Sequence, residues 1–131
     1  MKSIEIRRRV RWADVDASGR IYFARIFDYA AEGEWELLHG NGISRKELGK
    51  EYDFPRIHAD CHFKKALGLG DGFTLRFWAH RLGRTSIQYK FEVRLDADPQ
   101  ESAAAGGFTV VVTHGGRPCA IPPEIRAAYT D

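Results

Sequence analysis

The sequence predicts a single α+β domain in which one long helix packs on an antiparallel β-sheet. Between Tyr22 and His39, apolar residues recur every three or four positions, a spacing typical of an amphipathic helix. Most other segments alternate apolar and polar residues, which is typical of half-buried strands. The order is one strand, the long helix and then four strands, and a helix on one face of an antiparallel sheet is an α+β arrangement.

The first strand is predicted over residues 4–12, followed by a loop rich in Asp, Ser and Gly. Its apolar positions, expected to face the core, are Ile4, Ile6, Val10 and Trp12. The long helix follows and ends at glycines, with Gly33 predicted to mark a close approach to another element. Its core-facing stripe is predicted to be Phe23, Phe27, Ala30, Ala31, Trp35 and Leu38. Its solvent side is predicted to carry Glu32, Glu34 and Glu36.

A shorter helix is predicted over residues 44–51, where Ser44 and Glu47 have the spacing of a capping box. Later strands are predicted at 57–67, 73–82, 87–95 and 108–113, and residues 121–123 open a short tail. A single helix leaves much of the other sheet face open, so we expect a partner subunit.

Composition excludes several classes of protein. The 131 residues fit one domain, residues 1–131, and 44% hydrophobic with 29% charged residues indicates a globular rather than a disordered chain. A net charge of +2 argues against a nucleic-acid partner. No apolar run approaches the ~20 residues that span a bilayer, so we expect no membrane association.

The cellular compartment is predicted from the first residues and the cysteines. The first residues show no apolar secretory signal. Cys61 and Cys119 are too few for a disulfide framework, so we expect buried thiols in a cytoplasmic protein.

The segment from Asp14 to Tyr22 carries the most chemistry. It places Asp14 and Asp16 in a loop before a helix N-terminus, where backbone N–H groups lack intrahelical acceptors and favour negative charge. The N–H of Phe23 could therefore hold a developing oxyanion, while an ionised carboxylate attacks a carbonyl or activates water. On residue types alone, an aspartate before a helix is more simply a cap.

Residues 10–24, VRWADVDASGRIYFA, resemble the signature of the 4-hydroxybenzoyl-CoA thioesterase family. That signature is an aromatic residue, Asp-x-Asp-x-x-Gly, two branched residues, Tyr and then an aromatic residue or His. Further blocks resemble the family in the same order, at residues 54–63, 70–71, 82–86 and 116–123. The likeness covers nearly the whole chain and is greatest to members that act on hydroxybenzoyl-CoA or dihydroxynaphthoyl-CoA.

The resemblance implies the hotdog fold, a curved antiparallel sheet wrapped around one long helix, and hydrolysis of an aromatic acyl-CoA without metal or cofactor. Asp16 is implied to be the catalytic carboxylate, acting as nucleophile or as base for water. The Phe23 N–H is implied to polarise the thioester carbonyl, and Tyr22 belongs to the same motif. Because the family builds its site between subunits, a homodimer or homotetramer is implied.

Further site residues are implied by the resemblance. Arg84, with Thr85 and Ser86, lies in a turn that the family places near the CoA nucleotide, and arginine suits phosphate; a solvated arginine is the alternative. His58 and Asp60 are implied to line the pocket. With His62 they share one strand face, but steps of about 6 to 7 Å are wide for one metal ion.

The sequence departs from the family pattern at two positions, and alternatives remain for the catalytic residue and for the function. Phe23 stands where one branch has His, and Ala31 stands where the hydroxybenzoyl branch has an acid. Glu32 and Glu36 are rival catalytic residues, because a related branch places its carboxylate on this helix. The alternative functions are hydrolysis of acyl-carrier-protein thioesters and non-catalytic acyl-CoA binding.

Overall fold

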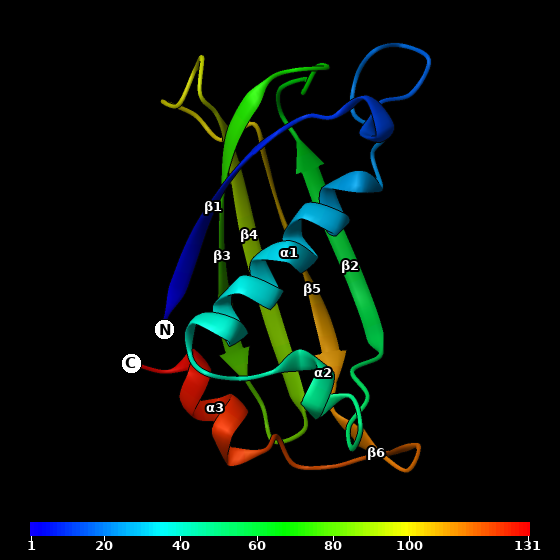
Figure 1. The fold of residues 1–131 in the computed structure, drawn as a ribbon, viewed down its shortest axis with the longest axis vertical. Coiled ribbons are helices and arrows are strands. Elements are labelled where there is room, and N and C mark those ends of the chain that lie inside the picture. The colour runs from blue at the N-terminus through cyan, green and yellow to red at the C-terminus, as the bar shows by residue number, and fades with distance from the viewer.

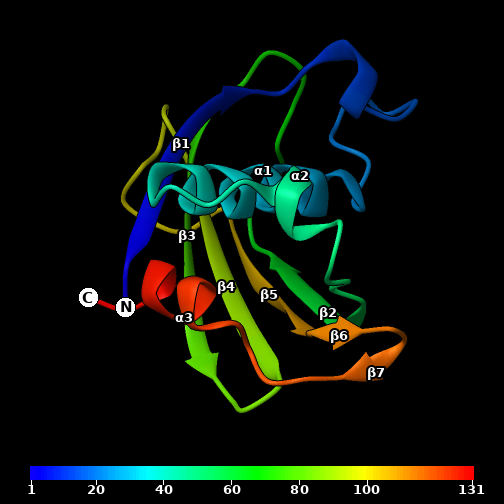
Figure 2. The same cartoon turned by 60° about the horizontal axis from the view of Figure 1, so that its bottom comes forward.

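The computed structural model describes residues 1–131. A five-stranded antiparallel sheet with the order β1-β3-β4-β5-β2 curves around the long helix α1 (Figures 1 and 2). Its strands are β1 (Ser3–Arg9), β2 (Arg56–Phe63), β3 (Gly72–Leu82), β4 (Ser86–Leu95) and β5 (Ala104–Val111). The other elements are α1 (Arg25–Gly40), α2 (Arg45–Leu48), α3 (Pro123–Tyr129) and the hairpin of β6 (Thr113–His114) and β7 (Arg117–Pro118). The predicted α+β arrangement is confirmed.

The core lies between α1 and the concave face of the sheet. Alternation on β3 and β4 is confirmed, since their inward side chains are buried: Phe73, Leu75, Phe77, Ala79, Ile87, Tyr89, Phe91 and Val93. None of the helices has both the length and the apolar character needed to cross a membrane.

The predicted core-facing stripe of α1 is wrong in part. Phe23 is 62% exposed and Trp35 is 44% exposed. The helix instead packs through Ile26, Tyr29, Ala30, Gly33, Glu34, Leu37 and Leu38. A Cβ on Gly33 would lie 2.9 Å from the Cβ of Phe77, so the predicted close approach at this glycine is confirmed. Ala30 and Gly33 let the helix lie close to the sheet, whereas Phe23 and Trp35 remain largely exposed.

Glu34 was expected on the solvent side, and this is also wrong. It is 4% exposed, and Arg56 donates to both of its carboxylate oxygens, at 2.7 and 3.3 Å. The Arg56 guanidinium lies over the Phe108 ring, 4.7 Å from its centroid. This pair connects α1 to the first residue of β2.

Several predicted boundaries are corrected. β1 ends at Arg9, and the chain then turns through a short 3₁₀ helix that leaves Trp12 80% exposed rather than in the core. α1 begins at Arg25 rather than at Tyr22. The predicted tail contains α3, which starts at Pro123, a residue well suited to the first turn of a helix.

The predictions for the capping box and for the two cysteines are confirmed in part. Ser44 accepts the N–H of Glu47 at 3.3 Å, which confirms half of the predicted capping box. Cys61 and Cys119 are free thiols, as expected, but half-buried rather than fully buried.

Candidate active site

Asp14 anchors the loop that carries Asp16. Its buried carboxylate accepts hydrogen bonds from the Tyr29 hydroxyl and, at 2.9 Å, from Nε of Arg11. Its backbone carbonyl accepts the N–H of Tyr22 at 2.8 Å. Burial acts to raise the pKa of Asp14, but the hydrogen bonds from Arg11 and Tyr29 outweigh it and lower the pKa. These contacts close the loop and attach it to α1.

Two backbone N–H groups are free where the loop meets α1. The N–H of Arg25 donates to the carbonyl of Tyr22 at 2.8 Å, and that of Ile26 donates to Phe23 at 3.4 Å. The N–H groups of Phe23 and Ala24 donate to no acceptor in the chain. The Phe23 N–H is therefore not occupied by an acceptor in the chain, although α1 starts later than expected, and its contact with an oxyanion stays a prediction.

The Asp16 carboxylate is exposed. Its Oδ1 accepts hydrogen bonds from the Ser18 hydroxyl at 2.5 Å and the Ser18 N–H at 2.8 Å, while Oδ2 accepts none. The hydrogen bond from the Ser18 hydroxyl is the main cause that lowers the pKa of Asp16, and the charge of Arg20 adds to it. Asp16 is therefore ionised at neutral pH, with one oxygen free for chemistry.

A hollow of about 280 Å³ lies beside Phe23. Its apolar lining includes Ile21, Phe23 and Phe63, and its charged lining is Arg20, Lys64 and Lys65. Asp16 is absent from the lining. Asp16, which is expected to act together with the Phe23 N–H, does not line the hollow next to Phe23 in a single chain.

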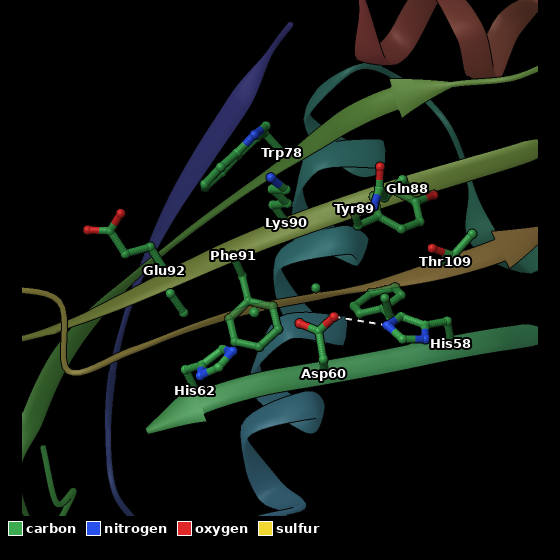
Figure 3. A pocket seen from close by; sticks show the side chains of 14 residues that line it. His58, Asp60, His62, Trp78, Gln88, Tyr89, Lys90, Phe91, Glu92 and Thr109 are labelled. Atoms are coloured by element: carbon green, nitrogen blue, oxygen red, sulfur yellow. Dashed lines mark hydrogen bonds and ion pairs between the residues drawn. The ribbon is translucent and has the colours of Figure 1, made fainter. Parts of the chain in front are cut away.

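His58 and Asp60 line a different hollow, of about 270 Å³, shown in Figure 3. With His62 they share one face of β2, as alternation predicts, and His58 Nε2 lies 2.9 Å from Asp60 Oδ2. Asp60 aligns across the sheet with Lys90 and Trp78, on the face turned away from α1. His58 and Asp60 are therefore separated by the sheet from the helix side on which Phe23 lies. No cluster of three or more potential metal ligands is present.

The turn between β3 and β4 contains Arg84 and Thr85, and β4 begins at Ser86. This hairpin lies at the opposite end of the sheet from the Asp16 loop (Figure 1). The carbonyl of Arg84 accepts the N–H of Ile121 at 2.9 Å, while its side chain is exposed. Within one chain these residues do not join the Phe23 hollow, and their role in CoA binding stays a prediction.

Glu32 and Glu36, the rival catalytic residues, lie together on the exposed side of α1. They line a shallow hollow with Trp35, and Glu32 accepts a hydrogen bond from Nε of Arg8 at 2.9 Å. Neither lines the hollow beside Phe23.

Tyr29 and Arg20 also lie at the candidate site, and neither is predicted there from the sequence. No local sequence pattern links Tyr29 to Asp14, which lies 15 residues earlier in the preceding loop. The sequence shows that Arg20, Lys64 and Lys65 are charged. It does not show that they line one hollow, because Arg20 is more than 40 residues from the two lysines in the chain.

Known proteins resemble this chain in sequence. Residues 10–129 match the thioesterase-like superfamily. A 1,4-dihydroxy-2-naphthoyl-CoA hydrolase from Prochlorococcus marinus (strain MIT 9313) is 32% identical over 129 residues, which cover 92% of this chain and 85% of the relative.

Solved structures resemble the fold. A 1,4-dihydroxy-2-naphthoyl-CoA thioesterase from Synechocystis superposes with a TM-score of 0.90, covering 98% of this chain and 96% of its own, at 17% identity. A gentisyl-coenzyme A thioesterase superposes with a TM-score of 0.86, covering 97% and 100%, at 24% identity. These likenesses confirm the hotdog fold.

Proposed function

The chain belongs to the thioesterase-like superfamily and is a thioester hydrolase, and from this premise we propose that it hydrolyses an aromatic acyl-CoA to the free acid and CoA. The relatives compared above are named for dihydroxynaphthoyl-CoA and gentisyl-CoA. Tyr22 and Phe23, 47% and 62% exposed, offer aromatic surface against which such an acyl ring can pack.

The observation that carries the proposal is the free N–H of Phe23, which follows the loop of the ionised Asp16. The N–H would bind the carbonyl oxygen and stabilise the negative charge that develops on it. As base, Asp16 takes a proton from the water that attacks the carbonyl. As nucleophile, it forms an anhydride that water then hydrolyses. In both routes the C–S bond breaks and CoA leaves as a thiolate, which needs little help from an acid.

The active unit that we propose is a homodimer formed through the free edge of β2. This strand pairs only with β5, and nearly all of its residues are exposed. Ile57 is 63% exposed and Phe63 is 44% exposed, and an unpaired strand edge is a template for a second strand. A partner at this edge would supply the wall that Asp16 lacks in one chain. A homotetramer would additionally cover the outer face of the sheet.

The cytoplasm is the location that we propose. It is supported by the thiols of Cys61 and Cys119, which form no disulfide. Burial, and secondarily the charge of Asp60, raises the pKa of Cys61 to about 11, which makes this thiol unreactive.

The test is hydrolysis of benzoyl-, hydroxybenzoyl-, phenylacetyl- and straight-chain CoA esters by the wild type and by Asp16→Asn. We expect the aromatic esters to be preferred and kcat to fall roughly 100-fold in the variant, the scale of losing a main catalytic group. Asp53→Asn removes an exposed carboxylate outside the proposed site and should retain activity. Full activity of Asp16→Asn would exclude its catalytic role. Turnover of carrier-protein thioesters alone, or binding without turnover, would favour the alternative functions.

A further inference from the structure

We propose that Arg20 and Lys64 form an anion-binding subsite beside Phe23, which binds a negatively charged group of the thioester substrate. The inference rests on the proposed function and specifies the chemistry of the substrate. The two cations belong to the hollow of about 280 Å³ that Phe23 also lines.

Backbone hydrogen bonds hold both walls of this hollow. The N–H of Ile21 donates to the carbonyl of Leu67 at 2.8 Å, and Arg20 forms an antiparallel bridge with the next residue of that segment. On the other wall, the N–H of Lys64 donates to the carbonyl of Ala103 at 2.8 Å. The two cations therefore project from fixed segments, although their side chains are exposed.

The positive charges of the hollow are not equally free. The ammonium of Lys65 lies 2.5 Å from Asp98 and 4.0 Å from Glu101, so its charge is neutralised within the chain. Arg20 and Lys64 are exposed and form no ion pair. Two positively charged side chains without an ion pair thus border a hollow that is otherwise mainly apolar, which suits a ligand with an apolar body and an anionic group.

The position of Phe23 favours the acyl group as the source of the anion. If its free N–H binds the thioester carbonyl, the subsite and that carbonyl lie in the same small hollow. In CoA, the long pantetheine arm separates the thioester from the phosphates by more than such a hollow spans. An ionised substituent on the acyl ring lies close to the carbonyl and fits directly. A phosphate of CoA folded back over the arm would use the same chemistry, and short thioesters separate the two sources.

Arg20 also affects Asp16, because its charge contributes to lowering the pKa of that carboxyl after the larger effect of Ser18. A change at Arg20 would therefore alter both binding and catalysis. Lys64 is not among the main causes that shift that pKa, so it is the cleaner position for a test. Lys46, an exposed lysine on α2 without an ion pair, is the matched control, because its reversal changes the net charge equally.

The experiment compares Lys64→Glu with Lys46→Glu on N-acetylcysteamine thioesters of benzoate and 4-carboxybenzoate, and on the CoA ester of benzoate. We expect Lys64→Glu to raise KM about tenfold for the 4-carboxybenzoyl thioester, the scale of a lost hydrogen bond to a charged group, and to raise it clearly less for the neutral benzoyl thioester. A rise confined to the CoA ester would identify a phosphate as the anion and would still support the subsite. Equal behaviour of the two variants on every thioester would overturn it.

A second measurement separates this inference from the proposed function. Isothermal titration with free CoA and with benzene-1,4-dicarboxylate requires no turnover. If the wild type hydrolyses none of the thioesters, the proposed function fails. The subsite then stands if Lys64→Glu binds either probe more weakly than Lys46→Glu, and it falls if both variants bind the probes equally or not at all.

Discussion

The hydroxyl of Tyr29 in α1 donates a hydrogen bond to the carboxylate of Asp14, two residues before Asp16 in the loop. Both residues are buried, at 1% and 2% exposure. Burial, together with the hydrogen bond to Asp14 and its negative charge, raises the pKa of Tyr29 to about 12, so the hydroxyl remains a donor throughout the neutral range. This contact fixes the position of the Asp16 loop relative to α1, and the Phe23 N–H lies just before the start of that helix.

Tyr29→Phe should therefore weaken both stability and catalysis. The change leaves a buried carboxylate short of one donor, which we expect to cost about 1 to 3 kcal/mol in the free energy of unfolding. We also expect kcat to fall more than KM rises, because the loop that carries Asp16 loses its attachment to α1. Urea unfolding and steady-state kinetics measure the two effects.

Tyr89→Phe is the matched control for Tyr29→Phe. Tyr89 is also buried, and its hydroxyl lies 2.8 Å from that of Tyr129, away from the loop. We expect this variant to lose stability with kcat unchanged. An equal fall of kcat in both variants would mean that Tyr29 acts only through overall stability.

Ser18→Ala should shift the acid limb of the pH–rate profile. Catalysis requires ionised Asp16, and the hydrogen bond from the Ser18 hydroxyl is the main cause that lowers the pKa of this carboxyl. Removing the hydroxyl raises the pKa, so we expect kcat/KM to decline at higher pH on acidification than in the wild type. Profiles of kcat/KM against pH for a neutral aromatic thioester measure the shift.

Ser44→Ala provides the comparison for that profile. The Ser44 side chain accepts the N–H of Glu47 at the start of α2, so its loss lowers stability by about 1 kcal/mol without touching Asp16. The acid limb should stay in place. A limb that is unmoved in Ser18→Ala would show that a group other than Asp16 governs it.

The alternation of β3 and β4 was predictable because one face of each strand meets the core and the other does not, so residue type follows position. The orientation of α1 was not, because large aromatic residues dominate a count of apolar spacing. The close contact between α1 and the sheet depends on Ala30 and Gly33, because their small side chains leave room for the sheet residues.

The candidate site was predictable in part. The free N–H of Phe23 follows from a loop that enters a helix, and the ionised Asp16 follows from its residue type and its local turn. The contact between Asp14 and Tyr29 joins two elements and has no local signature. His58 and Arg84 lie on other parts of the chain, and within one chain neither lines the hollow beside Phe23.

Gly33→Ala should destabilise the fold despite a better helix propensity. The substitution gains about 1 kcal/mol in helix propensity, but the new Cβ would lie 2.9 Å from the Cβ of Phe77, and overpacking a core costs about 1 to 3 kcal/mol. We expect a lower urea midpoint. Gly40→Ala, at the exposed end of the same helix with no atom within 4 Å of its added Cβ, should be neutral or stabilising. A midpoint raised equally in both variants would refute the packing argument.

Arg56→Met should lower the free energy of unfolding more than the removal of both Arg56 and Glu34 does. It leaves the carboxylate of Glu34, 4% exposed, without its two hydrogen bonds, and an unpaired buried charge typically costs about 3 to 5 kcal/mol. Because Arg56 is itself 38% exposed, water can reach the site and we expect the lower end of that range. The double variant Glu34→Met with Arg56→Met buries no charge and should recover most of the loss. Urea unfolding of the two single variants and the double variant measures the coupling. Strictly additive losses would show that the pair does not act as a unit.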